Sequence, residues 1–66
     1  MFAVTKVIKD DRTILGFYEE LDAARAEAKR TNGLEKERCT ICVIEADFDE
    51  NGRIKGGKYK LYDAFY

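Results

Sequence analysis

One stretch of the chain, residues 19–33, has the composition of a helix and lies between two segments that have the composition of strands. It reads EELDAARAEAKRTNG and is rich in alanine, glutamate, lysine and arginine, which have high helix propensity. Leu21, Ala24 and Ala28 recur at i, i+3 and i+7 and form one narrow apolar stripe. Asn32 and Gly33 tolerate the left-handed conformation that ends many helices, so we expect the helix to stop there. A single helix with one apolar stripe predicts a sheet for it to cover.

The segments on either side of this helix are rich in β-branched and aromatic residues, as strands are. Residues 2–8 and 14–18 flank a polar cluster and predict a first hairpin, with its turn near Asp10 to Arg12. Residues 39–48 and 58–65 flank Asn51-Gly52, a strong signal for a second hairpin. The 66 residues are therefore expected to form a single domain, residues 1–66. Its predicted fold is α+β with the order ββαββ, a four-stranded, mainly antiparallel sheet with one helix packed on one face.

The register of the second hairpin follows if Asn51 and Gly52 are its two loop residues. Ile44 then faces Tyr59, and one face of the hairpin is apolar. That face is expected to lie under the helix and comprises Cys42, Ile44, Ala46, Phe48, Tyr59 and Leu61. The opposite face pairs acidic with basic side chains, namely Glu45, Asp47 and Asp49 with Lys58 and Lys60. A longer loop that reaches Gly56-Gly57 is the alternative.

The composition argues against several functions. The chain carries 12 basic and 13 acidic residues, so it lacks the positive field on which binding to nucleic acid or an anionic membrane depends. It has no histidine, serine, tryptophan or proline, which removes the commonest general base and the commonest hydroxyl nucleophile. We therefore expect no enzyme and no cofactor. An enzyme that uses the clustered carboxylates Glu45, Asp47 and Asp49 is the least favoured alternative. On an open face, nothing raises the pKa of these groups or excludes water from them.

The sequence also predicts where the protein resides. No apolar run is long enough to span a bilayer. The N-terminal residues MFAVTKVIKDD lack the charged leader and long apolar stretch of a signal peptide. We expect a cytoplasmic protein without a membrane partner.

The stretch DFDENGRIKG, residues 47–56, has the D-x-D-x-N-G spacing that opens an EF-hand calcium loop. Such a loop needs a bidentate acid at its twelfth position, where this chain has Lys58, and its ninth position is Lys55. Aspartate, asparagine and glycine are also the residues that turns prefer. We expect a tight turn and no metal site.

Cys39 and Cys42 form a C-x-x-C pair, which could be redox-active or half of a zinc site. The chain offers no second pair and no histidine to complete a zinc site. Residues three apart in a strand point to opposite faces, so a disulfide between these two would be strained. We expect reduced, structural cysteines, with Cys42 in the core and Cys39 partly exposed. A metal site shared between molecules is the alternative.

Two surfaces are candidates for binding. In the register above, Ile41, Val43 and Tyr62 form an apolar spot on the face away from the helix, with Phe65 and Tyr66 at its end. Exposed apolar residues near a sheet edge are typical of a contact with another protein or with a second copy. The alternative is weak nucleic-acid binding, in which aromatic side chains stack on bases and cations contact phosphates. Its residues would be Arg53, Lys55, Lys58 and Lys60.

The first half of the chain, FAVTKVI…ILGFYEELDAARAEAKR, resembles the layout of many short uncharacterised bacterial and phage proteins. In that layout a strand of alternating apolar residues is followed by a second strand containing a glycine, and then directly by an acidic, alanine-rich helix. The matching residues are Val4, Gly16, Phe17 and Ala24. The resemblance implies a small accessory protein of a prokaryote or mobile element, and it brings no catalytic or binding residues with it. The function expected from the sequence is thus a small, non-enzymatic module for protein interaction or self-association.

Overall fold

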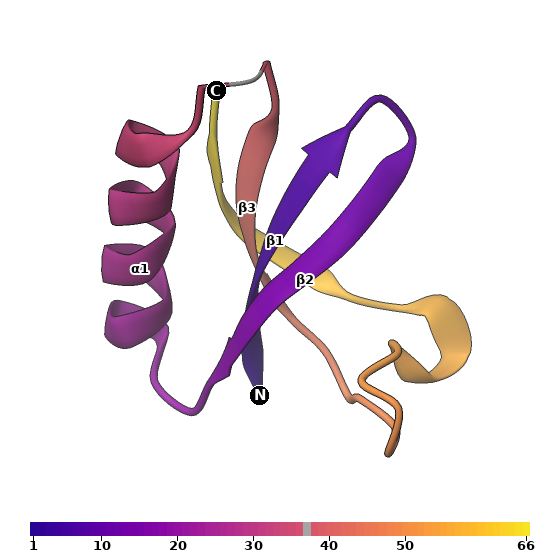
Figure 1. The fold of residues 1–66 in the computed structure, drawn as a ribbon. Coiled ribbons are helices and arrows are strands. Elements are labelled where there is room, and N and C mark those ends of the chain that lie inside the picture. Colours follow the sequence, from indigo (N-terminus) through magenta and orange to yellow (C-terminus); the bar gives the residue numbers. More distant parts are fainter. Residues whose placement is uncertain (37) are drawn as a thin grey trace.

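The computed structural model describes residues 1–36 and 38–66, and these form one sheet with one α-helix against it. In chain order the elements are β1 (Phe2–Ile8), β2 (Asp11–Tyr18), α1 (Leu21–Leu34), β3 (Thr40–Glu45), a short 3₁₀ turn η1 (Lys55–Gly57) and β4 (Lys60–Phe65). Figure 1 shows α1 alone on one side of a strongly twisted sheet, with the segment between β3 and β4 extending away at one end. The expected α+β fold with the order ββαββ is confirmed.

The first strand of the chain lies in the middle of the sheet. The strand order is β2-β1-β3-β4, and each neighbouring pair is antiparallel. β2 returns along β1 after a two-residue turn in which Lys9 has a φ of 56°. β2 and β4 are therefore the edges of the sheet. Each edge strand has one extra residue where its register shifts, Leu15 in β2 and Tyr62 in β4, and such bulges increase the local twist.

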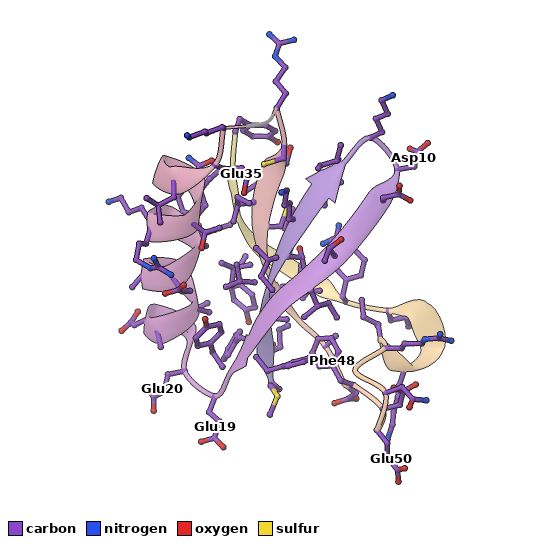
Figure 2. All side chains as sticks on the ribbon, viewed as in Figure 1. Asp10, Glu19, Glu20, Glu35, Phe48 and Glu50 are labelled. Atoms are coloured by element: carbon purple, nitrogen blue, oxygen red, sulfur yellow. The ribbon has the colours of Figure 1, made fainter. Side chains whose placement is uncertain are left out.

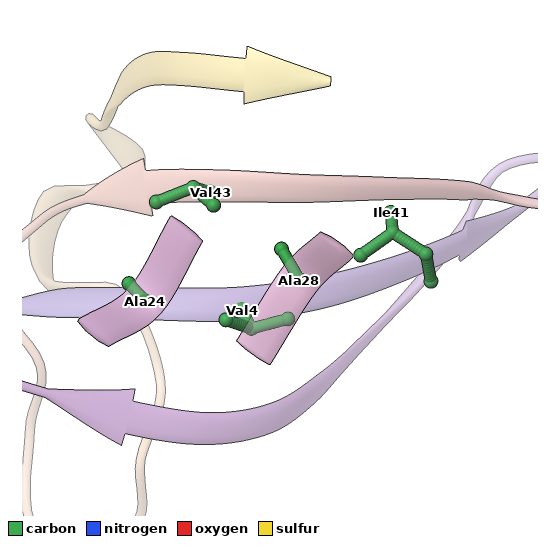
Figure 3. Packing of buried hydrophobic residues seen from close by; sticks show 5 residues of the cluster. All are labelled: Val4, Ala24, Ala28, Ile41 and Val43. Carbon is green, nitrogen blue, oxygen red and sulfur yellow. The ribbon is translucent and has the colours of Figure 1, made fainter. Parts of the chain in front are cut away.

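α1 packs on the sheet through alanines, as its apolar stripe predicted. Ala24 and Ala28 are fully buried against Val4, Ile41 and Val43, which come from the two central strands (Figure 3). Small side chains on the helix let its backbone approach the sheet closely. Partly buried residues surround this helix-side core, namely Phe2, Tyr18, Leu21, Cys39, Tyr62 and Phe65.

Two ion pairs tie the ends of α1 to the sheet. Arg25 bonds to Asp63 of β4, and Lys6 of β1 bonds to Glu35, the residue after the helix, at 3.0 Å. Both pairs are partly exposed, so each contributes modestly to stability.

The other face of the sheet carries a second, smaller core. Ala3, Cys42 and Ile44 are buried there, and Phe48 and Ile54 pack on them from the segment between β3 and β4. We call residues 46–59 the crossing segment and this face the loop side of the sheet. β3 is thus covered on both faces, which explains why four consecutive residues, Ile41 to Ile44, are all buried.

The register expected for β3 and β4 is wrong. Ile44 lies opposite Leu61, not Tyr59, and the two strands are joined by the whole crossing segment. The longer loop, the alternative drawn from the sequence, is the arrangement observed, with Gly56 and Gly57 at φ values of 67° and 68°. Tyr59 and Leu61, which were expected under the helix, are 47% and 53% exposed, and Leu61 lies beside Ile44 on the loop side.

The helix extends beyond its expected stop. Gly33 lies inside the last turn of α1, which ends at Leu34, and the amide of Glu35 donates to the carbonyl of Thr31 at 3.0 Å. Gly33 does not have the positive φ that a C-cap glycine adopts, so the Asn32-Gly33 signal is not used.

Candidate functional site

Three residues of the expected interface lie on the opposite face from the one predicted. Ile41 and Val43 are fully buried beneath α1. Tyr62 also lies on the helix side, where its ring meets Phe2 edge-on with centroids 5.5 Å apart and its hydroxyl donates to Glu45 Oε1 at 3.1 Å. The expectation that these three side chains form an exposed spot is wrong, because α1 packs on the face of β3 that carries Ile41 and Val43. Cys42 and Ile44, which were expected under the helix, lie on the loop side.

The C-terminal aromatic residues divide between core and surface. Phe65 packs against the helix-side core, whereas Tyr66 is 92% exposed. Phe65 is the last residue of the edge strand β4 and Tyr66 follows it, and the one hydrogen-bonded neighbour of β4 among the described strands is β3. β4 is therefore an edge of the sheet that has Tyr66 exposed at its end.

The apolar side chains that are exposed near this edge come from the loop side. A row of directly paired residues crosses that side from one edge to the other: Phe17, Ala3, Ile44 and Leu61. Its two inner members are buried, and its outer members Phe17 and Leu61 are 44% and 53% exposed. Tyr59 lies beside β4 in sequence and is also half exposed. The exposure of these residues was not predicted from the sequence. The available signal was the run of four apolar residues in β3, which indicates a strand that is covered on both faces.

Arg12 joins the two edges of the sheet across the loop side. Its Nη1 donates to Thr5 Oγ1 at 2.8 Å, and its Nη2 donates to the hydroxyl of Tyr59 at 3.2 Å. Arg12 belongs to the edge strand β2, and Tyr59 immediately precedes the opposite edge strand β4. The hydroxyl of Thr5 is fully buried and also reaches the carbonyl of Cys42 at 3.5 Å. This Arg12–Tyr59 bridge anchors the end of the crossing segment over a polar group in the sheet.

The acidic motif of residues 47–52 forms a turn, as expected. Asp49 Oδ1 accepts hydrogen bonds from the backbone amides of Asn51 and Arg53, both at 2.9 Å. These bonds lower the pKa of Asp49, because they favour its ionised form, and the bond from the Arg53 amide has the largest effect. Gly52 has a φ of 77°, and its amide donates to the carbonyl of Asp49 at 3.0 Å. Asp49, which would be the third residue of a calcium loop, thus uses its carboxylate to close a turn.

The two cysteines occupy the positions expected of structural thiols. Both are free; Cys42 is buried in the loop-side core, and Cys39 is partly buried at the edge of the helix-side core. They face opposite sides of the sheet. Within residues 1–36 and 38–66, no group of three or more Cys, Asp or Glu side chains is arranged to hold a metal ion.

The four cations of the nucleic-acid alternative are all exposed, as is Tyr59 between Lys58 and Lys60. They are not aligned on one strand face: Arg53 and Lys55 belong to the crossing segment, and Lys60 lies in β4 opposite Glu45. The ammonium of Lys60 is 4.9 Å from the centroid of the Tyr62 ring. The acidic trio is also dispersed, since Glu45 is on the helix side and Asp49 is in the turn.

Comparisons with known proteins add no relative: no family model, curated protein or solved structure matches the chain. Of the helices that the structure describes, none is long and apolar enough to cross a membrane.

Proposed function

We propose that this protein is a small, non-enzymatic interaction module that binds another protein, or a second copy of itself, through the β4 edge. The observation that supports the proposal is the exposure of apolar side chains around that edge. We define the β4 edge surface as Tyr59, Leu61 and Tyr66, which are 47%, 53% and 92% exposed. Edge strands recognise extended partner segments by adding a strand, and flanking apolar side chains provide affinity.

The backbone of the β4 edge also suits selective pairing. The bulge at Tyr62 divides the β4 ladder into two short stretches, so a partner strand would follow only part of the edge. Short, bulged edges discourage indiscriminate strand pairing. We therefore expect a defined partner rather than open-ended association.

The experiment is a pull-down with the tagged protein from a lysate of the source cell, with and without nuclease, for the unaltered chain and two variants. Leu61→Lys places a charge on the β4 edge surface. Leu15→Lys is the matched control, because Leu15 is 45% exposed in β2, at the opposite edge of the sheet. We expect a nuclease-resistant protein that Leu61→Lys loses and Leu15→Lys retains. Light scattering on the purified chain shows whether that partner is a second copy. Equal capture by both variants would contradict the proposal.

Nucleic-acid binding is the second candidate, supported by the exposure of Tyr59 between two lysines. Its residues are Arg53, Lys55, Lys58 and Lys60. Phosphate binding weakens steeply as salt rises, whereas an apolar contact is unchanged or strengthened. Fluorescence anisotropy with a labelled single-stranded oligonucleotide at increasing salt distinguishes the two. Affinity that falls with salt and is lost in the Lys58→Glu variant would favour this candidate.

A further inference from the structure

The crossing segment, residues 46–59, joins the sheet at two neighbouring points. It leaves β3 after Glu45 and enters β4 at Lys60, and these two residues are directly paired. The ladder between β3 and β4 therefore holds the two ends of the segment side by side. Gly56 and Gly57 lie near one of these ends, both with a positive φ and with open space around them, and glycines of this kind allow the chain to bend. The segment can consequently move without displacing either strand.

The segment also has backbone structure of its own. Its turn is closed by two amide-to-carbonyl hydrogen bonds of 2.8 Å, from Asp49 to Arg53 and from Lys55 to Asp47. Among the described residues, its one backbone hydrogen bond to the rest of the molecule joins the amide of Ala46, its first residue, to the carbonyl of Met1 at 3.1 Å. The turn is therefore held by bonds that do not involve the sheet.

Side chains provide the other attachments of the segment. Phe48 and Ile54 pack on the loop-side core, and the Nη2 of Arg12 donates to the hydroxyl of Tyr59 at 3.2 Å. The ring of Phe48 also meets a phenylalanine ring of β2 edge to face, with centroids 5.0 Å apart. Figure 2 shows Phe48 where the segment approaches the sheet, whereas Glu50 lies at the outer end of the molecule. The attachment thus depends on a few side chains, three of them aromatic or aliphatic.

The contacts of the crossing segment are separate from those of α1. The helix-side core consists of residues on the other face of the sheet, and it shares none of its described members with the loop-side core. Loss of the loop-side contacts would therefore leave the packing of Ala24 and Ala28 on the sheet unchanged. A region held by few apolar contacts opens at a lower free energy than the whole molecule unfolds.

We propose that the crossing segment is a flap that opens as one unit while α1 and the four strands stay folded. In the closed form Ala3, Cys42 and Ile44 are at most 5% exposed. Opening uncovers them next to Leu61, which is paired with Ile44 and already half exposed. The apolar surface beside β4 is thus larger in the open form than in the closed form. This inference goes beyond the proposed interaction function and does not depend on it.

The test uses the buried thiol of Cys42 as the reporter of opening, in a Cys39→Ala background so that one thiol reacts. Labelling of the intact chain by excess DTNB, a thiol reagent, is followed at urea concentrations below the unfolding transition. Hydrogen exchange of the Ala28 amide in α1 is measured by NMR under the same conditions. We expect the opening constant reported by Cys42 to exceed that of Ala28 by at least about tenfold. It should also change little with urea, because an opening flap exposes less surface than unfolding does.

Two variants separate the opening of the flap from the unfolding of the whole chain. Ala26→Gly, at an exposed position of α1, should speed the exchange of Ala28 about fivefold through lost helix propensity. It should leave the labelling of Cys42 unchanged, because α1 is folded in both the closed and the open form. Phe48→Ala should accelerate the labelling at least about tenfold, because it removes an apolar attachment of the flap.

Three results would overturn the inference. Labelling of Cys42 that rises with urea together with the exchange of Ala28, or that Ala26→Gly accelerates equally, would show that the loop-side core opens only with the whole molecule. Amides between β3 and β4 that lose protection as fast as Cys42 is labelled would show that an edge strand moves instead. Labelling that Phe48→Ala leaves unchanged would show that the segment does not cover the thiol.

Discussion

At the scale of the residue, Asp49 closes the turn of the crossing segment with its ionised carboxylate. Its pKa is lowered by hydrogen bonds from the amides of Arg53 and Asn51, so the ionised form stabilises the turn above the ordinary aspartate pKa of about 3.9. That contribution is lost as the pH falls through the lower pKa of the folded state.

We therefore expect the amide shifts of Asn51 and Gly52 to change in acid with a midpoint below the ordinary aspartate value. Asp49→Asn retains an oxygen that accepts the same bonds and should remove this transition while preserving the turn. The check is a pH titration followed by amide chemical shifts. A transition that persists in Asp49→Asn would show that another group causes it.

Ile41 should be among the residues most sensitive to truncation, because it is fully buried between α1 and the sheet. We expect Ile41→Ala to lower the free energy of unfolding by about 2–5 kcal/mol. A domain of this size has roughly 3–10 kcal/mol in total, so the variant is expected to be marginal. Leu61→Ala, at a half-exposed position, should change it by only about 0.5 kcal/mol. Urea unfolding measures both, and similar losses would place the two residues in comparable environments.

At the scale of the element, α1 contains a glycine that serves no conformational need. Gly33 is helical, and a Cβ there would meet nothing within 4 Å. Gly33→Ala should therefore stabilise the fold by about 0.4–1 kcal/mol, mainly by restricting the unfolded chain. Gly52→Ala should destabilise it, because Gly52 has a φ of 77° and its added Cβ would crowd Phe17. Thermal unfolding compares the two, and a loss of stability in Gly33→Ala would contradict the helical assignment.

The elements could be predicted from the sequence because each has a strong local signal. The alanine-rich stripe of α1 and the β-branched segments gave the order ββαββ, and Asn51-Gly52 correctly predicted a turn. The face of β3 that lies under the helix could not be predicted. A strand that is buried on both sides has no apolar–polar alternation, and residues 41–44 are all apolar. Asn51-Gly52 predicted a register that differs from the observed one by two residues, a shift that leaves each side chain on the same face. The candidate interface was wrong because the helix covers the face of Ile41 and Val43, not that of Cys42 and Ile44.

At the scale of the whole molecule, the crossing segment is what converts an open sheet face into a second core. Its attachment depends on the Arg12–Tyr59 bridge and on Phe48 and Ile54 packing over Ile44. We expect Arg12→Ala to cost on the order of 1 kcal/mol and to accelerate amide hydrogen exchange in residues 46–59 more than in α1. Arg53→Ala, at an exposed position of the same segment, is the control. Uniform acceleration across the molecule would show that the bridge supports the global fold instead.

The position of β1 has a mechanical consequence. β1 and β4 run in the same direction with β3 between them, and the two chain ends lie at opposite ends of the sheet (Figure 1). A force applied to the ends would therefore load the ladders on both sides of β3 along the strands, so that many hydrogen bonds must break together. Strands pulled apart from a shared end would instead separate one bond at a time. The chain is consequently arranged to resist stretching between its ends, a property that suits a link under tension.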